Sequence, residues 1–214
     1  MNVLVIGANG QTGRQVVELL LEDNDHTVWA MVREASQTQE MEKLGAEPIV
    51  ADLTQDIAFA VEGMEAVIFA AGSGPNTGVD QTWAVDRDGA IKVIDACREN
   101  AVERFIMLSS VGTDAPDTMP EVLRPYLEAK AAADQYLQKS GLNYTIIRPG
   151  RLNNDMESET IIAQKSLHGK RGQISRKDVA VTIVKSLENE HTYRQTFEII
   201  GGGQHSIDEA LKML

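Results

Sequence analysis

Short runs of apolar residues alternate along the chain with longer segments in which apolar side chains recur every three or four positions. The short runs are rich in β-branched residues and have the length of strands, while the longer segments have the period of helices with one apolar face. The run from Ala66 to Ala71 is apolar throughout, which is typical of a strand covered on both faces. The pattern therefore predicts βαβ units and an α/β fold with a mainly parallel sheet.

Six strands and five helices are predicted up to residue 150. The strands are expected at Val3–Ile6, Thr27–Val32, Pro48–Ala51, Ala66–Ala71, Arg104–Leu108 and Leu142–Ile147. The helices are expected at Gln11–Glu22, from a Ser36 cap to Gly45, at Asp56–Glu62, at Thr82–Glu99 and at Glu121–Lys139. Because crossovers between parallel strands are right-handed, we predict a doubly wound, Rossmann-like sheet with its ligand crevice at the carboxyl ends of the strands.

The pattern loosens after Arg151. We expect an edge strand at Thr160–Ala163, a helix at Lys177–Leu187, a strand at Thr196–Ile200 and a final helix from Ser206. Residues 151–214 are too few for a separate domain. We therefore predict one dinucleotide-binding domain over residues 1–214, in which 151–214 form a small cap on the substrate side.

Composition narrows the class of partner. A formal net charge of −12 opposes binding to nucleic acid or to an anionic membrane, so a small-molecule substrate is expected. Cys97 is the single cysteine, which excludes an intrachain disulfide, and the four histidines lack ligand spacing, so no metal site is predicted. The sequence starts in a strand without a basic or apolar leader, and we expect a cytoplasmic monomer or homodimer.

Three glycines follow the first predicted strand and open the first helix, in the segment Gly7-Ala8-Asn9-Gly10-Gln11-Thr12-Gly13. A glycine turn lets the backbone approach a ligand closely, and the N–H groups at a helix N-terminus attract phosphate. In this strand-turn-helix context the segment predicts a diphosphate site.

The glycine spacing, with Ala-Asn inside it and Thr before the last glycine, resembles that of the atypical and extended short-chain dehydrogenase/reductase families. Small bacterial NAD(P)H-binding proteins of this superfamily, near the NmrA-like and biliverdin-reductase-B-like groups, are the most similar. The resemblance implies a Rossmann fold and a nicotinamide cofactor. It assigns the cofactor's diphosphate to Gly7, Asn9, Gly10, Gln11, Thr12 and Gly13.

The residue after the second strand predicts which dinucleotide binds. NAD-dependent members place a carboxylate there for the ribose 2′-OH, whereas Arg33 stands there in this chain and suits a 2′-phosphate. We therefore expect NADP(H) rather than NAD(H). The resemblance further implies that Asp52 and Leu53 contact the adenine ring, and that Ala70, Ala71 and Gly72 allow close approach to the ribose.

Tyr126 and Lys130 lie one turn apart on one face of a predicted helix and match the Tyr-x-x-x-Lys motif of the superfamily. Phenol has a pKa near 10 and exchanges protons poorly at neutral pH. A unit charge at ~4 Å contributes on the order of 4 kcal/mol at an effective dielectric of about 20, or roughly 3 pKa units. We therefore expect Lys130 to bring Tyr126 within reach of the working pH.

A serine completes the set implied by the resemblance. Aligned on the strand that ends at Leu108, the family's catalytic residue falls on Ser110, and its neighbour Ser109 is the alternative and a cofactor contact. The segment Arg148-Pro149-Gly150-Arg151 resembles the part that touches the nicotinamide, which assigns Pro149, Gly150 and Arg151 to the cofactor. Lys130 is also expected to reach the nicotinamide ribose.

These residues favour an NAD(P)H-dependent oxidoreductase that transfers hydride between the nicotinamide and a small carbonyl, quinone or related acceptor. Two alternatives stay open. One is an NmrA-like redox sensor that binds the dinucleotide without turnover, and the other is an NAD-dependent epimerase or dehydratase, against which the short C-terminal part argues. The substrate depends on loops 72–80, 112–120 and 152–158, whose shapes the sequence does not give.

Overall fold

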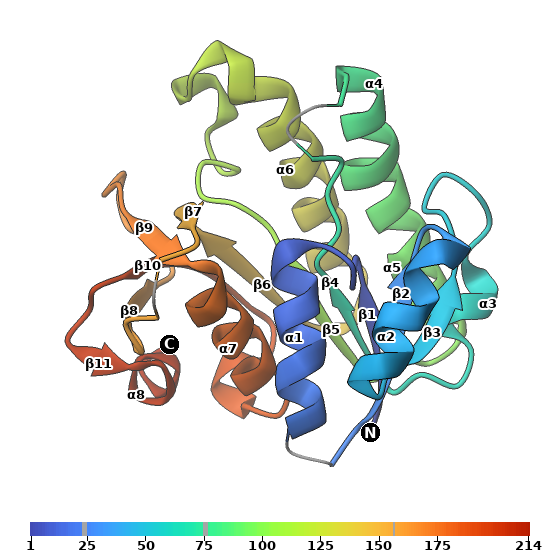
Figure 1. The fold of residues 1–214 in the computed structure, drawn as a ribbon. Helices are drawn as coiled ribbons and strands as arrows, with labels where there is room; N and C mark the ends of the chain where they lie inside the picture. Colours follow the sequence, from blue (N-terminus) through green and yellow to red (C-terminus); the bar gives the residue numbers. More distant parts are fainter. Residues whose placement is uncertain (23–24, 75–76, 156) are drawn as a thin grey trace.

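The computed structural model describes residues 1–22, 25–74, 77–155 and 157–214. Within these ranges nine strands form one sheet in the order β11-β8-β10-β6-β5-β4-β1-β2-β3 (Figure 1). Every pair of neighbouring strands from β3 across the sheet to β10 is parallel. Beyond β10, strand β8 runs antiparallel to β10, and β11 runs antiparallel to β8. The strands are β1 (Asn2–Ile6), β2 (Thr27–Val32), β3 (Glu47–Val50), β4 (Ala66–Phe69), β5 (Arg104–Leu108), β6 (Asn143–Pro149), β8 (Thr160–Gln164), β10 (Gln195–Gly201) and β11 (His205–Ser206). The predicted Rossmann-like fold is confirmed.

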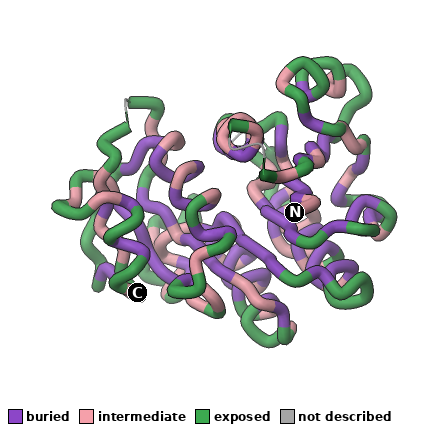
Figure 2. The backbone as a smooth tube through the Cα atoms, turned by 90° about the horizontal axis from the view of Figure 1, so that it is seen from below, coloured by how far each residue is buried: buried purple, intermediate pink, exposed green. Residues whose placement is uncertain are grey.

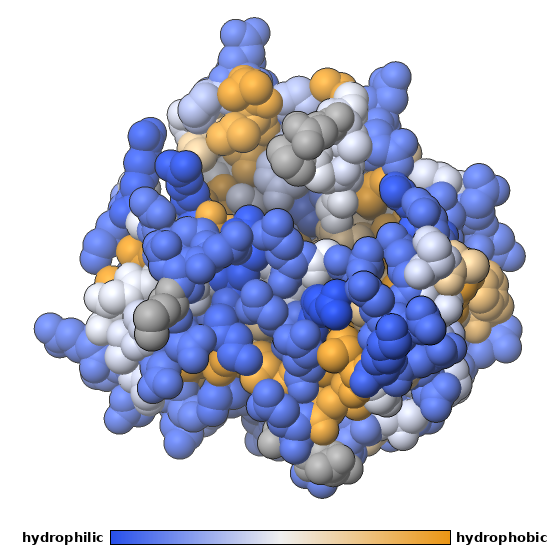
Figure 3. Space-filling model, viewed as in Figure 1, coloured by the Kyte–Doolittle hydropathy of each residue, from blue (hydrophilic) through white to orange (hydrophobic). Residues whose placement is uncertain are grey.

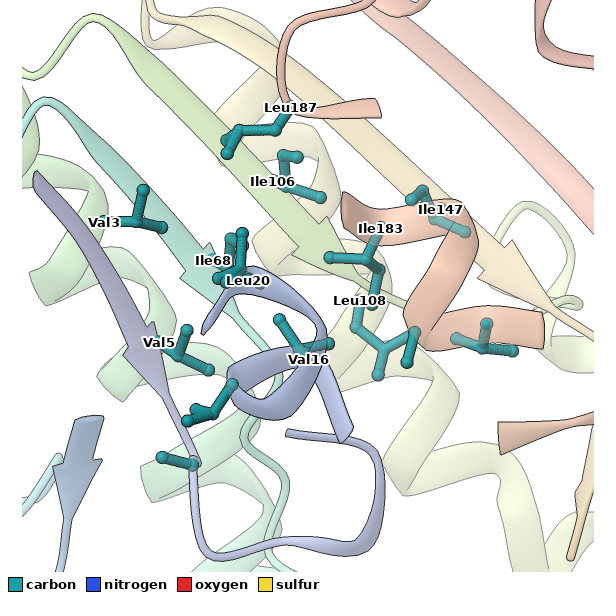
Figure 4. Close-up of a cluster of buried hydrophobic side chains, with 14 of the residues drawn as sticks. Val3, Val5, Val16, Leu20, Ile68, Ile106, Leu108, Ile147, Ile183 and Leu187 are labelled. Atoms are coloured by element: carbon teal, nitrogen blue, oxygen red, sulfur yellow. The ribbon is translucent and has the colours of Figure 1, made fainter. Parts of the chain in front are cut away.

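Helices cover both faces of the sheet, and the tube in Figure 2 shows buried backbone in the layer between them. They are α1 (Gln11–Glu22), α2 (Thr38–Leu44), α3 (Ala58–Val61), α4 (Val79–Thr82), α5 (Ala90–Glu99), α6 (Arg124–Lys139), α7 (Arg176–Ser186) and α8 (Ile207–Lys212). One cluster of buried residues joins α1 and α7 to the sheet, with Val16, Leu20 and Ile183 against Ile68, Ile106 and Ile147 (Figure 4). A second cluster joins α3, α5 and α6 to the opposite face.

The helix predicted at Thr82–Glu99 is interrupted. It begins as α4, continues as a π-helical segment over Trp83–Gly89, and becomes regular only in α5. A π-helix bonds each N–H to a carbonyl five residues back, so it widens the helix and changes the direction of the side chains. The helix predicted from Glu121 likewise starts as a 3₁₀ turn, η4 (Glu121–Leu123), before α6.

Two smaller predictions are wrong. Ser36 does not cap α2, because it lies within a 3₁₀ turn, η1 (Ala35–Gln37), and Gln37 Oε1 instead accepts the N–H groups of Arg33 and Glu34 at 3.1 and 3.2 Å. Strand β8 is not the edge of the sheet, because β11 pairs along its outer side at Thr160 and Ile161. Two 3₁₀ turns, η3 (Pro116–Thr118) and η5 (Glu190–Thr192), complete the helical elements within the described ranges.

The C-terminal part carries a two-stranded parallel sheet that the pattern did not predict, formed by β7 (Arg151–Asn153) and β9 (Gln173–Ser175). Asp178, buried at the start of α7, accepts hydrogen bonds from the backbone N–H groups of Ser158 and Glu159 and so ties the loop after β7 to the helix. Residues 75–76 and 156 of the expected substrate loops lie outside the described residues. Where the chain is described, no helix has both the length and the apolar character needed to span a bilayer.

Candidate active site

A cleft of about 330 Å³ opens at the carboxyl ends of β1, β2, β3 and β4. Nine residues predicted to bind the cofactor line it together: Gly7, Asn9, Gly10, Arg33, Asp52, Leu53, Ala70, Ala71 and Gly72. Sequence reasoning missed other lining residues, among them Gln37, Ser73, Gln81 and Val85. The carboxyl ends of parallel strands, next to a helix N-terminus, are where dinucleotides bind in this fold.

The glycine turn leaves no room for side chains on its inner side. Gly7 has a φ of +84°, and a Cβ there would lie 2.8 Å from the Cα of Ala71, so the turn after β1 touches the segment after β4 directly. A Cβ on Gly13 would lie 2.2 Å from the carbonyl oxygen of Gly7. Thr12 and Gly13 are buried, whereas Gln11 is exposed. The backbone can therefore approach a ligand, and the first N–H groups of α1 have no acceptor within the helix.

Arg33 lies at the outer end of this cleft. Its side chain is two-thirds exposed and its Nη2 is 3.5 Å from Glu34 Oε1, an exposed pair that holds it weakly. Arg33, Asp52 and Gln81 also line an adjoining hollow of about 500 Å³. Hydrogen bonds from the Thr54 backbone and hydroxyl to Asp52 lower the pKa of that carboxyl, so it is ionised at neutral pH.

Lys130 is buried on the inner face of α6, with only 3% of its side chain exposed. Its Nζ donates hydrogen bonds of 3.2 Å to the carbonyl oxygens of Ala71 and Leu108, at the ends of β4 and β5. The same nitrogen lies 3.2 Å from Oδ1 of Asp86, which is fully buried on the π-helical segment. Lys130 therefore connects α6 to two strand ends and to the interrupted helix.

The sequence analysis missed Asp86. Its Oδ2 accepts the backbone N–H of Ser73 at 3.0 Å, which fixes the segment after β4 that borders the cleft. Asp86 could have been found because it shares a helix face with Ala90, Val93 and Cys97. These three positions are apolar and fully buried, so a carboxylate on the same face is conspicuous. A buried charge of this kind needs a buried partner.

Tyr126, one turn before Lys130, is half-buried. Burial raises its pKa; Lys130 opposes this, Asp86 and Asp134 add to it, and the Ser110 hydroxyl lowers it slightly, so that the pKa of Tyr126 is raised overall. The expected lowering toward neutral pH is therefore wrong. The physical reason is that the charge of Lys130 is offset by Asp86, so it does not outweigh the cost of burying a phenolate.

The two adjacent serines have different surroundings. Ser109 is buried, and its hydroxyl donates a 2.9 Å hydrogen bond to Asp134 Oδ2, which also accepts the Nε of Arg148 at 3.0 Å. Ser110 is half-buried and its hydroxyl donates to the carbonyl of Val111 at 3.2 Å. Lys130 and Ser110 both act on the pKa of Tyr126, which indicates that the three predicted residues are near one another, and Lys130 reaches the carbonyl oxygens at the ends of β4 and β5.

The segment after β6 is packed into the sheet and the C-terminal part. The N–H of Gly150 bonds to the carbonyl of Ile199 at 2.9 Å, and that of Arg151 to the carbonyl of Gly172 at 3.0 Å. A Cβ on Gly150 would lie 2.6 Å from the Gly172 oxygen, so packing alone requires this glycine. The side chain of Arg151 is exposed. Contact of Pro149, Gly150 and Arg151 with the nicotinamide stays a prediction.

Comparison with known proteins decides the family. The profile of a family described as NAD(P)H-binding matches residues 7–190. The chain belongs to this NAD(P)H-binding family. The match confirms the resemblance inferred from the glycine turn. The glycine turn and the N-terminus of α1 have the features that a dinucleotide diphosphate needs, and binding of the cofactor in this cleft stays a prediction.

Two relatives of this NAD(P)H-binding protein are similar along their whole length. A Bacillus subtilis protein named "Uncharacterized sugar epimerase YhfK" is 45% identical, with all of both chains covered. A solved structure titled "Putative NAD-dependent epimerase/dehydratase" from Bacillus halodurans is 40% identical with a TM-score of 0.95, again with both chains covered completely.

A solved oxidoreductase, ylbE from Lactococcus lactis, is 26% identical with a TM-score of 0.87 and covers all of this chain and 96% of its own. The family is therefore oxidoreductase-like, while the names within it differ on the reaction.

Proposed function

We propose that this protein is a reductase that uses NADPH to reduce a small carbonyl, quinone or related acceptor. The observation that carries the proposal is the joining of Ser110, Tyr126 and Lys130 at the strand ends beside a cleft of the NAD(P)H-binding type. In this proposal residues 151–214 form the substrate side of the same domain.

The proposed reaction divides the work between cofactor and protein. Bound NADPH supplies a hydride to the acceptor carbon and is oxidised. Tyr126 gives its hydroxyl proton to the acceptor oxygen, and the proton is replaced from water. The Ser110 hydroxyl donates a hydrogen bond to that oxygen and orients it. Lys130 keeps positive charge beside the phenol; the predicted hydrogen bond to the ribose hydroxyls would require its Nζ to give up one of its three present partners, Ala71 O, Leu108 O and Asp86 Oδ1.

The state of Tyr126 supports reduction in particular. Because burial keeps the pKa of Tyr126 above its ordinary value, the phenol is protonated at neutral pH and is ready to donate. An epimerase, which the names of two relatives favour, starts by oxidising its substrate and needs the phenolate as base. The structure of the free site is better suited to donation than to acceptance of a proton.

Preference for NADPH rests on Arg33 and the hollow beside it. The Arg33 guanidinium is mainly exposed and pairs only with the exposed Glu34, so it is available to bind a 2′-phosphate. The adjoining hollow provides space for that phosphate. Asp52 lines the same hollow and is ionised, so it limits the negative charge that the hollow can accept.

The rim near Tyr126 favours an acceptor with an apolar face. Val122 and Leu123, just before α6, are 85% and 43% exposed, and Val79 on α4 is 52% exposed. Figure 3 shows apolar side chains gathered over the start of α6 on a face that is otherwise mainly hydrophilic. A quinone ring offers an apolar surface of this kind together with a carbonyl oxygen for Tyr126.

The proposal is tested by titrating the protein with NADPH and NADH, and then measuring consumption of the preferred cofactor with quinones, flavins and aldehydes. We expect NADPH to bind more tightly, and Arg33→Ala to weaken NADPH by about tenfold or more while leaving NADH nearly unchanged. Tyr126→Phe should abolish most turnover. Binding without turnover of any acceptor supports a sensor, and epimerisation with retained NAD supports the alternative reaction.

A further inference from the structure

Asp86 is a fully buried carboxylate that acts on the proposed proton donor, and the proposed reaction does not use it. It comes from the π-helical segment Trp83–Gly89 and is held on both oxygens, by the N–H of Ser73 at 3.0 Å and by Lys130 Nζ at 3.2 Å. Gly72, the residue before Ser73, is also in contact, since a Cβ there would lie 3.2 Å from Asp86 Oδ1. The carboxylate is therefore fixed relative to the strand end that borders the cleft.

The ammonium of Lys130 is surrounded by groups that offset its charge. Besides Asp86, two carbonyl oxygens accept its hydrogen bonds, and the ring of Phe69 lies with its centroid 5.8 Å from Nζ. Burial would lower the pKa of Lys130, but the charge of Asp86 above all opposes this, and the pKa of Lys130 is raised overall. Lys130 is therefore charged and fixed in place.

We propose that Asp86 is a positioning residue of the site: by holding and offsetting the Lys130 ammonium, it keeps Tyr126 protonated and able to donate a proton during reduction. The inference rests on the proposed function for its purpose, but the effect of Asp86 on Tyr126 is a property of the protein without cofactor. The interruption of the helix allows Asp86 to reach Lys130, because the π-helical segment directs Asp86 toward α6.

The other charged groups around Tyr126 and Lys130 are few among the described residues. Lys130 and Asp134 follow Tyr126 on α6, and Asp134 is itself paired with Arg148 from β6. Asp86 faces both from the π-helical segment, and Ser110 adds an uncharged hydroxyl from the end of β5. Removing the charge of Asp86 leaves Lys130 as the dominant charge near Tyr126, which favours phenolate.

The test is an ultraviolet titration of tyrosinate in the cofactor-free protein, with and without Tyr126→Phe so that the difference isolates Tyr126. The change is Asp86→Asn, which keeps the size of the side chain and removes its charge. The matched control is Asp88→Asn, because Asp88 lies on the same helical segment but is exposed and paired with Arg87.

We expect Asp86→Asn to move the Tyr126 midpoint to lower pH by about 1 to 3, and Asp88→Asn to leave it unchanged. Asp86→Glu, which restores the charge, should recover most of the difference. A folded Asp86→Asn protein whose midpoint stays in place, or moves up, overturns the inference. This titration needs no turnover. Failure of the reductase proposal is detected in a separate assay, as the absence of acceptor reduction by the wild-type protein.

A second measurement, of thermal unfolding, tests whether Asp86 and Lys130 are coupled in case Asp86→Asn destabilises the fold. Asp86→Asn leaves the Lys130 charge buried without its partner and should lower the thermal unfolding midpoint. Adding Lys130→Met removes that charge and should raise the midpoint again. If the double variant is no more stable than Asp86→Asn alone, the two side chains are not coupled and the inference is wrong.

Discussion

Ser109 donates its hydroxyl hydrogen to Asp134 Oδ2 at 2.9 Å, so this serine is committed to a buried carboxylate although it adjoins the proposed catalytic serine. We expect Ser110→Ala to reduce kcat by roughly 10- to 100-fold with little effect on stability, because it removes a hydrogen bond to the acceptor oxygen. Ser109→Ala should instead lower the free energy of unfolding by about 1 to 3 kcal/mol, because Asp134 loses a buried donor. Urea unfolding and steady-state kinetics on both variants distinguish the two roles, and a reversed pattern would make Ser109 the catalytic serine.

The pH dependence of reduction should have a single limb at high pH. Turnover needs protonated Tyr126, whose pKa is raised above its ordinary value near 10, mainly by burial. The protonated form is therefore complete through neutral pH and is lost only as the pH rises past that raised pKa. We expect kcat/KM for the acceptor to be flat from about pH 6 to pH 9 and to fall only above about pH 10, provided that the protein stays folded. A rise in rate across neutral pH would indicate that phenolate is the active form.

Gly13→Ala should prevent normal closure of the glycine turn. A Cβ there would lie 2.2 Å from the Gly7 oxygen, which is backbone and cannot move without displacing the turn. We expect a loss of about 1 to 3 kcal/mol in unfolding free energy and a large loss of NADPH affinity. Gly78→Ala is the control for stability, because among the described residues no heavy atom beyond its two chain neighbours lies within 4 Å of a Cβ at Gly78, and its φ of −72° suits alanine.

Arg104 should matter for stability and not for the site. It is buried at the amino end of β5 and donates to the carbonyl oxygens of Leu187, Asn143 and Ser186 at 3.1, 2.9 and 2.8 Å. Arg104→Met leaves several buried carbonyls without donors, and we expect it to cost about 2 to 4 kcal/mol. Arg98→Met, which removes an exposed arginine 3.3 Å from Asp95, should cost less than about 1 kcal/mol. NADPH affinity of folded Arg104→Met should match wild type.

The fold could be predicted well because its central strands are short runs that are almost entirely apolar. Helices bury both faces of β1, β2, β4, β5 and β6. In the sequence this burial is visible as apolar runs such as Ala66 to Phe69. The pair β7 and β9 was missed because three residues are too short to show a period. The π-helical turns at Trp83 to Gly89 were missed because the apolar pattern around them is still that of a helix.

The lining of the cleft could be predicted in large part, but the electrostatics around Tyr126 could not. Gly7, Arg33 and Asp52 line one cleft because their strands end at the same edge of the sheet. The direction of the Tyr126 pKa shift was predicted wrongly, because the sequence placed Lys130 beside Tyr126 but showed neither the burial of the phenol nor the partner that offsets Lys130. Asp86 reaches that position only through packing of the interrupted helix against α6, which no local pattern encodes.

The π-helical turns also set stability and chemistry against each other in this chain. π-helical turns are rare compared with regular α-helix, and they occur frequently at functional sites. A one-residue deletion within Trp83 to Gly89 would restore regular hydrogen bonding, but it would rotate Asp86 away from Lys130. Directed evolution for heat resistance alone would therefore favour shortening this helix, and the improved variants would lose the proton donor's environment.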